Sequence, residues 1–385
     1  MNAKPLTEYC TLNMGQSPDS KTYNTQGNGL PFYQGNADFG ETHPITRVWC
    51  SAPVKVAEDG DILISVRAPI GAMNMAVERC CIGRGLAALT PIRNKCSKQF
   101  LYYALQSKVA SLIAQGTGST FKAISKKVLE ATCIPAYSTI EQEQIAETIG
   151  RVDNTIAARR NQLVLLDQLV KSRFIELFGD CLSNPKGWKT KCLEDIADVG
   201  SSKRVFVEEL QEDGIPFFRG TEVGALAEGK SVFPELFITE EHYAALCSAT
   251  GAPQIGDLLM PSICPDGRIW VVNTDKPFYF KDGRVLWIHA IDASFNSTFL
   301  LYSLKDRIMT DYSSIASGTT FAELKIFSLK KCKVFAAPLT LQNEFATFVE
   351  QTDKSKYYSS LSFRYCQAAA NTYRQEWITC RTSDF

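Results

Sequence analysis

The 385-residue sequence has no uninterrupted apolar run of about 18 residues, and its start, MNAKPLTEYC, has no apolar segment behind a basic one. The first absence argues against a membrane-spanning helix, and the second argues against a secretory signal peptide. The hydrophobic fraction of 45% and the charged fraction of 21% are ordinary for globular proteins. We therefore expect a cytoplasmic chain of two or three domains, each with a core of its own.

Metal-ligand patterns and disulfide patterns are also missing. The only histidines are His43, His242 and His289, and none is spaced with Cys or acidic residues as metal ligands would be. The 13 cysteines lie at irregular spacing, with no CxxC pair and an odd total. This pattern favours reduced, mostly buried thiols over a disulfide framework or a zinc site.

Catalytic motifs are scarce. The sequence contains no glycine-rich cofactor loop, no [DN]PP[YF] tetrapeptide of adenine methyltransferases, and neither GxSxG nor HExxH. One segment, Gly224–Ser231, matches the phosphate-loop pattern GxxxxGK[ST]. That mechanism requires a helix that opens at Lys230 and Ser231, but Pro234 interrupts its first turn. We interpret the match as chance, and a nucleotide-dependent enzyme that uses this loop remains an alternative.

The formal net charge is zero, with 41 basic and 41 acidic residues. Binding of nucleic acid through bulk positive charge is therefore excluded. A DNA-binding chain with this balance must gather its positive charge on one face. The lysine clusters Lys122, Lys126 and Lys127, and Lys330, Lys331 and Lys333, make such a face possible.

The most ordered pattern is a heptad repeat between Ile140 and Phe178. Apolar residues occupy every d position and three a positions, which is typical of a helix that pairs with another helix. Such a helix would be roughly 55 to 60 Å long and would act as a spacer; a long amphipathic helix lying on one core is the alternative. The predicted seam residues are Ile145, Ile149, Val152, Ile156, Leu163, Leu166, Val170 and Leu177.

A second heptad segment lies 200 positions later in the same frame. Phe345, Val349 and Phe363 are its predicted seam residues, and Cys366, Ala370, Tyr373 and Trp377 continue the frame. Each helix is a natural partner for the other, so we predict an antiparallel coiled-coil spacer.

The segments before the two helices also repeat. GLPFYQG at 29–35 corresponds to GIPFFRG at 214–220, and GDILISVRAPIG at 60–71 corresponds to GDLLMPSICPDG at 256–267. We expect a buried strand within 60–71, a second over 81–91 and a helix over 99–115. The sequence thus predicts an α+β fold with an internal duplication: a first domain at 1–137, a helix at 138–178, a linker and second domain at 179–337, and a second helix with a tail at 338–385.

The repeat weakens one further catalytic hypothesis. Asp311, Glu323 and Lys325 together resemble the acid, acid and lysine set of metal-dependent nucleases. The copies of Glu323 and Lys325 in the first half are Ala123 and Ser125, and no strand pattern carries Asp311. We interpret these residues as solvated loop charges.

Two similar domains joined by paired helices form a device for reading two separated targets. Reading DNA bases requires Arg, Lys, Asn and Gln side chains on loops that face a groove. The candidate DNA-binding residues are Gln34, Asn36, Arg67, Arg79, Arg84 and Lys122 in the first half, and Arg219, Lys230, Arg268, Arg284 and Lys325 in the second.

Several of these segments, in this order, resemble the specificity subunits of type I restriction-modification systems. They include NMGQSPDSKTYN, GLPFYQGNADF, GDILISVRAPIG and CIGRGLAAL in the first domain, IPAYSTIEQEQIAETIGRVDNTI leading into the first helix, and GIPFFRGTEV and LTLQNEFATFVEQTDKSK in the second half. The resemblance implies a non-catalytic subunit with two target recognition domains, each of which reads half of a bipartite site on double-stranded DNA.

The resemblance also implies partners. Methylation subunits that use S-adenosylmethionine would dock on the helical spacer, and restriction subunits that use ATP and Mg would join them. The second helix departs from the family pattern, because Thr352, Lys356 and Ser359 lie in its seam and the segment after Tyr358 is atypical. A coiled-coil scaffold protein that does not bind DNA is a further alternative.

Overall fold

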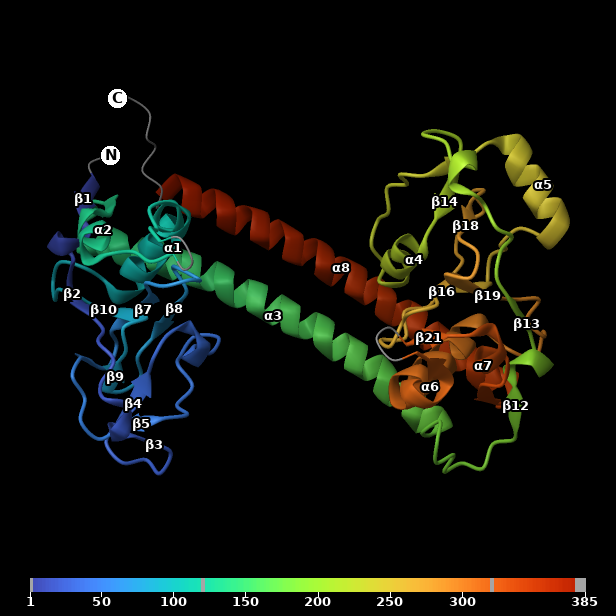
Figure 1. The fold of residues 1–385 in the computed structure, drawn as a ribbon, viewed down its shortest axis with the longest axis horizontal. Coiled ribbons are helices and arrows are strands. Elements are labelled where there is room, and N and C mark those ends of the chain that lie inside the picture. Colours follow the sequence, from blue (N-terminus) through green and yellow to red (C-terminus); the bar gives the residue numbers. More distant parts are fainter. Residues whose placement is uncertain (1–2, 119–121, 319–321, 378–385) are drawn as a thin grey trace. The chain divides into compact units, whose positions relative to one another are not determined.

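The computed structural model describes residues 3–118, 122–318 and 322–377. The chain divides into two compact units (Figure 1): residues 1–161 with 360–385, and residues 162–359. Each unit contains one copy of the repeated globular domain and one part of each long helix. We refer to the copies as the first domain, before residue 138, and the second domain, residues 179–337.

The first domain is built around a four-stranded antiparallel sheet in the order β2-β10-β7-β8. Residues Ile62 and Ile64 of β7 belong to the same core as α1, whereas Leu63 belongs to a core on the opposite face. Both faces of the strand are thus buried, which explains its continuous apolar run. The bounds are β2 Cys10–Met14, β7 Ile62–Ser65, β8 Met73–Met75, β10 Leu86–Pro91, α1 Lys98–Ala114 and α2 Lys126–Ala131.

A second sheet of the first domain has the order β3-β5-β4-β9-β6. Its strands are β3 Tyr23–Asn24, β4 Leu30–Tyr33, β5 Trp49–Cys50, β6 Val56–Ala57 and β9 Cys80–Ile82. The expectation of one strand over 81–91 was wrong. The segment 83–85 is a turn that separates β9 from β10, and these two strands lie in different sheets.

The second domain repeats the first sheet with the same strand order, β13-β19-β16-β17. The helix α6 takes the place of α1, and α7 takes the place of α2. The predicted duplication is therefore present in the sheet topology. The bounds are β13 Asp198–Gly200, β16 Leu258–Pro261, β17 Trp270–Val271, β19 Val285–His289, α6 Ser297–Ile315 and α7 Ile326–Lys330.

The remainder of the second domain differs more from the first. A three-stranded sheet of order β15-β14-β18 carries two helices, of which α5 has no counterpart among the described residues of the first domain. The bounds are β14 Ile215–Phe218, α4 Gly220–Ala227, β15 Phe237–Ile238, α5 Glu240–Thr250, β18 Tyr279–Phe280, β20 Ala316–Ser317 and β21 Glu323–Leu324. Short 3-10 helices lie at Leu6–Glu8, Ser20–Thr22, Asn36–Asp38, Leu193–Asp195 and Val207–Glu209.

A two-stranded sheet closes each domain just before its long helix. The pair β1 Ala3–Pro5 and β11 Cys133–Pro135 does so in the first domain. The pair β12 Thr190–Cys192 and β22 Lys333–Phe335 does so in the second. The long helix thus starts within four residues of a strand that is fixed to the first strand of its own domain.

The long helices are α3 Thr139–Phe178 and α8 Leu339–Trp377. In the first unit the Arg374 guanidinium lies 2.6 Å from the Asp153 carboxylate, and Arg160 lies over the Phe363 ring. In the second unit Arg173 lies 2.6 Å from Glu344. Within each unit the residue numbers on α8 fall as those on α3 rise, so the two helices pack antiparallel.

All predicted seam residues lie in the described part of the chain and are buried or half-buried. The second unit has the larger apolar seam, in which Phe174, Phe178 and Phe345 contact one another. The helix α8 continues past Tyr358, where the sequence is atypical, and Ala370 is 3% exposed. Tyr373 and Trp377 share the heptad frame but are 43% and 41% exposed.

No described helix is long and apolar enough to cross a bilayer. Across residues 3–118, 122–318 and 322–377, no group of three or more His, Cys, Asp or Glu is placed to hold a metal ion. The 12 cysteines in these segments are free thiols, and seven of them are buried.

Candidate nucleic-acid interface

Three segments of the first domain meet beside the parallel strand pair β4 and β9. They are the loop after β2, the residues after β4, and the turn 83–85. The Ser17 hydroxyl accepts a hydrogen bond from the Arg84 backbone N–H at 3.2 Å, and it lies 2.9 Å from the Gln34 amide nitrogen. The Ser17 hydroxyl thereby links Gln34 and Arg84, two of the predicted DNA-binding residues.

An open pocket of about 420 Å³ lies at this meeting point. Its floor is apolar, because the rings of Tyr23 and Phe32 stack with centroids 4.6 Å apart. Gln34 and Arg84 line the same pocket with exposed side chains. Amide and guanidinium groups are the side chains that form paired hydrogen bonds with the edges of adenine and guanine. The geometry therefore suits recognition of a base edge.

Two glycines permit the close approach of these segments. A Cβ on Gly85 would lie 2.5 Å from the Gln34 carbonyl oxygen, and a Cβ on Gly83 would lie 2.6 Å from the Gln34 amide oxygen. Any larger residue would push the turn away from Gln34. The Gly-Arg-Gly sequence thus places an exposed arginine on a turn that packs tightly against β4.

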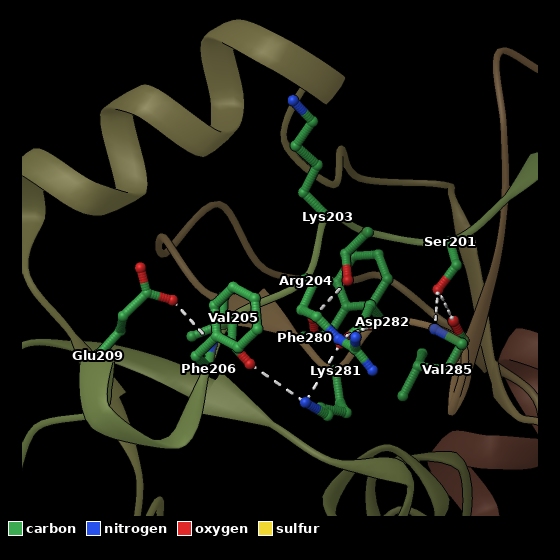
Figure 2. Close-up of polar contacts among 12 residues, drawn as sticks. Ser201, Lys203, Arg204, Val205, Phe206, Glu209, Phe280, Lys281, Asp282 and Val285 are labelled. Carbon is green, nitrogen blue, oxygen red and sulfur yellow. Dashed lines mark hydrogen bonds and ion pairs between the residues drawn. The ribbon is translucent and has the colours of Figure 1, made fainter.

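The second domain repeats the contact between a loop serine and the turn. Its Ser201 hydroxyl accepts from the Gly283 backbone N–H at 2.8 Å and donates to the Val285 carbonyl oxygen at 2.6 Å. Figure 2 shows this loop, 201–209, beside the turn 281–285. Arg219 follows β14 as Gln34 follows β4, and Arg284 lies in the turn one position later than Arg84 does. Arg219 thus corresponds to Gln34, whereas Arg284 lies in the corresponding turn at the position of Gly85.

Basic residues that the sequence reasoning missed surround this second site. Figure 2 shows the exposed Lys203 side chain extending away from the other labelled residues. Arg204 lies 3.5 Å from the Asp282 carboxylate, and the Lys281 ammonium donates to the Val205 carbonyl oxygen at 3.2 Å. In the first domain Ser17 and Tyr23 were also missed, although both lie within the segment NMGQSPDSKTYN that carried the family resemblance.

A second cluster of predicted residues lies where the chain returns after α1 and α6. In the first domain Arg67 forms a β-bridge with Ala123, next to Lys122. In the second, the carboxylate of Glu323 binds Arg284 and lies 2.5 Å from the Lys325 ammonium. These cations, Lys325 first, hold the pKa of Glu323 below its usual value. Glu323 is a half-buried residue of β21, so its interpretation as a solvated loop charge was wrong.

The remaining predicted residues are dispersed. Asn36 begins a short 3-10 helix, and Arg79 lies 3.2 Å from Glu58. Arg268 lies 2.8 Å from Asp266, and Lys230 binds Glu228. Neither of the two site clusters described above includes these four side chains.

The structure contradicts the two catalytic alternatives. Residues 224–227 of the phosphate-loop match form the end of α4, and no helix begins at Lys230 or Ser231 in the described chain. Phosphate binding of that kind needs the amino end of a helix at this point. Asp311 does not join Glu323 and Lys325, because its carboxylate is bonded to Arg307 at 3.0 Å.

A family model described as the type I restriction modification DNA specificity domain matches residues 1–166 and 185–357. A specificity subunit of the MjaX type I restriction enzyme from Methanocaldococcus jannaschii is 40% identical over 164 residues. That match spans 43% of this chain and 39% of the relative. The MjaIX specificity subunit of the same organism is 24% identical over 372 residues, 87% of this chain and 83% of the relative.

A solved structure supports the fold. The crystal structure of a type I restriction-modification system S subunit from M. genitalium superposes with a TM-score of 0.61 at 15% identity, over 99% of this chain and 96% of that one. At this identity the likeness concerns the fold alone. Since the family model matches most of the sequence, in two segments that each contain one copy of the duplicated domain, this chain belongs to the family of type I restriction modification DNA specificity domains.

Proposed function

We propose that this chain is the specificity subunit of a type I restriction-modification complex, in which each domain reads one half of a bipartite site on double-stranded DNA. The observation that carries the proposal is the repetition of one polar site in both domains. Gln34 and Arg219 each follow the first strand of a parallel pair, and Arg84 and Arg284 lie in the corresponding turns of the two domains. Such side chains discriminate bases in the major groove.

The helices α3 and α8 set the gap between the half-sites in this proposal. Both are continuous, with 40 and 39 residues, and they pair antiparallel within each unit. A continuous helix rises about 1.5 Å per residue, so a fixed length of helix specifies a fixed distance. This supports a spacer role.

The partners in this proposal are methylation subunits that hold S-adenosylmethionine, and restriction subunits that hold ATP and Mg. Apolar side chains on α3 support a docking surface for the methylation subunit. Val164, Leu165, Leu169 and Ile175 are 49%, 54%, 49% and 42% exposed and lie on the side of α3 away from the seam. An exposed apolar stripe of this kind marks a protein interface. The complex would work in the cytoplasm, where its DNA is.

The deciding experiment is a base-resolution map of DNA methylation in cells that hold the partner methylation subunit, with and without this chain. We expect a split motif that appears only with the chain. Replacing residues 1–137 with the first domain of another family member should change one half of the motif and leave the other half and the gap unchanged. A map without a motif, obtained while the complex is present, would contradict the proposal.

The control variant for the nucleotide alternative is Lys230→Ala. It should leave complex assembly intact, whereas an enzyme that used the 224–231 loop would lose function. The scaffold alternative is tested by DNA binding at increasing salt. The affinity of a specificity subunit should fall steeply, because each neutralised phosphate releases a counterion.

A further inference from the structure

The two domains carry opposite net charges. Residues 1–137 contain 14 Lys and Arg against nine Asp and Glu, which gives +5. Residues 179–337 contain 17 against 21, which gives −4. The zero net charge of the whole chain therefore hides a basic first domain and an acidic second domain. Only the first has the excess of positive charge that favours contact with a phosphate backbone.

The same contrast appears at the corresponding sites. In the first domain the cations Arg67, Arg84 and Lys122 form no ion pair with any described residue. One carboxylate lies close to the pocket: Asp38, which accepts from the Gln34 backbone N–H at 2.7 Å and lies 3.9 Å from Arg47. The guanidinium of Arg84 is therefore available to a ligand.

In the second domain each predicted cation is held by a carboxylate. Arg219 lies 2.5 Å from Glu222 and 3.2 Å from Glu235, and Arg284 binds Glu323. Lys325 also binds Glu323. Outside the two clusters, predicted arginines and lysines are paired in both domains: Arg79 with Glu58 in the first, and Lys230 and Arg268 with Glu228 and Asp266 in the second. Lys203, a residue of this site that was not among the predicted ones, forms no ion pair with a described residue.

Glu323 accounts for much of this difference. The Leu324 backbone N–H donates to the Ser262 carbonyl oxygen at 2.8 Å, as the Ile124 N–H donates to Val66 at 2.9 Å. Position 323 in the second domain thus corresponds to position 123 in the first, which is alanine. One substitution between the copies adds a carboxylate that neutralises two cations in the second domain.

We propose that the two recognition domains contribute unequally to DNA affinity: the first provides most of the phosphate-neutralising contacts, and the second, whose Arg284 and Lys325 are held by Glu323, provides mainly discrimination between bases. This inference rests on the proposed function. When a cation that is already paired with a carboxylate binds a DNA phosphate, it exchanges one anionic partner for another. It therefore adds little net positive charge to the DNA, and few counterions are released from the DNA. Fixed in place, it can still present donors to a base edge.

The test is the salt dependence of DNA binding by the complex of the full chain with its methylation subunit. The probes are a duplex that carries the methylated motif and a duplex of scrambled sequence. Lys122→Gln should reduce the slope of log affinity against log salt by about 0.9, the value expected for one lost phosphate contact. The matched variant Lys325→Gln, a lysine of the same cluster in the second domain that is paired with Glu323, should reduce the slope by less than half as much.

Reciprocal variants at the corresponding positions test the role of Glu323. Glu323→Gln removes the charge but keeps the shape, and it should increase the slope by about 0.9 or more as Arg284 and Lys325 are freed. Ala123→Glu places a carboxylate opposite Arg67, its β-bridge partner, and should decrease the slope. Thermal unfolding of each variant establishes that it is folded before its slope is compared.

Equal reductions from Lys122→Gln and Lys325→Gln would overturn the inference, and so would an unchanged slope in Glu323→Gln. Either result, obtained together with a split methylation motif, would leave the proposed function intact. Absence of motif-dependent binding in the unmodified complex would instead overturn the proposed function. The two failures are thus distinguishable.

Discussion

At the scale of single residues, the sites of the two domains share a hydrogen bond between a serine hydroxyl and the backbone of a turn, and they differ in their exposed side chains. Ser17 and Ser201 both accept from the turn that precedes the central strand of the first sheet. The residue after the parallel strand is Gln34 in one domain and Arg219 in the other. The bond between the serine hydroxyl and the turn is therefore common to both sites, while the exposed side chains differ between the domains.

Gly85→Ala tests the close approach that builds the first site. The added Cβ would lie 2.5 Å from the Gln34 carbonyl oxygen, so the turn must shift. We expect a loss of about 1 to 3 kcal/mol in unfolding free energy, together with weaker DNA binding. The control is Gly35→Ala, where φ is −175° and no atom lies within 4 Å of an added Cβ. Equal losses of stability in the two variants would contradict the steric argument.

Glu222 makes the second domain sensitive to acid. Burial alone would raise the pKa of its carboxyl, but hydrogen bonds from the Arg219 side chain and backbone outweigh burial and lower the pKa from 4.5 to about 2. A lowered pKa in the folded state gives stability that is present above about pH 4.5 and is lost as the pH falls toward 2.

We therefore expect Glu222→Gln to remove about 1 to 3 kcal/mol of unfolding free energy at neutral pH and progressively less below pH 4.5. Urea unfolding of both proteins across this pH range measures the difference. A constant difference between the two proteins would show that the carboxylate charge is not responsible.

At the scale of elements, one glutamine fixes the start of each long helix. Gln142 is fully buried, its amide nitrogen donates to the Lys95 and Tyr137 carbonyl oxygens, and its amide oxygen accepts from the Ser97 N–H. Gln342 makes the same three bonds to Ser294, Ala337 and Asn296. These bonds tie α3 and α8 to the segments that open α1 and α6.

Gln142→Leu leaves three backbone groups without partners, so it should destabilise the first unit by about 2 to 4 kcal/mol. The same loss is expected in the second unit for Gln342→Leu. The neighbouring Gln144 is exposed, and Gln144→Leu is the matched control. Hydrogen exchange on the full chain reads the two units separately. If one substitution reduced the protection from hydrogen exchange equally in both units, a local role for the buried glutamine would be contradicted.

The aromatic seam of the second unit is the most buried part of the helix pair. Phe345 is fully buried against Phe174, Phe178 and Tyr302. Phe345→Ala should cost about 3 to 5 kcal/mol of unfolding free energy, because it leaves a cavity among rings. Tyr358 lies on the same helix and is 69% exposed, so Tyr358→Ala should cost under about 0.5 kcal/mol. Similar costs for both would argue against the seam.

At the scale of the whole molecule, the apolar stripe on α3 predicts how the chain enters its complex. Leu165→Asp combined with Leu169→Asp should abolish copurification with the methylation subunit, because a partner would have to bury two carboxylates. The unfolding temperature of the chain should change little, since both residues are exposed. The matched control is Ala245→Asp with Ala249→Asp, which adds the same charges at the same spacing on α5. Retained copurification in the α3 variant would place the interface elsewhere.

The fold was predictable wherever its signal was local. The heptad frame predicted a helix over 140–178, and α3 spans 139–178. The repeated strand and turn segments predicted two α+β domains, and both first sheets have the same strand order. The prediction of one strand over 81–91 was wrong, because the apolar residues of this segment continue across a turn. The glycines at 83 and 85 mark that turn only once their contact with Gln34 is known.

The site was less predictable than the fold. Gln34 with Arg84, and Arg219 with Arg284, were among 11 predicted residues, but nothing in their spacing distinguished them from Arg79 or Arg268. Their grouping depends on contacts between segments about 50 and 65 residues apart in the chain. The charges of the two domains were countable from the sequence as soon as the domain boundaries were placed. The pairing of each predicted DNA-binding arginine and lysine of the second domain with a carboxylate could not be read from the sequence.

The sequence by itself determined the duplication, the long helices and their shared register, because periodicity and repetition are properties of order along the chain. The tertiary structure decided which polar side chains form a site and which cations are left unpaired. Those properties depend on distances between residues far apart in sequence, which only the packed sheets and turns define. Ala123 and Glu323 illustrate the division: the sequence aligns them as copies, and only the fold places Glu323 against Arg284.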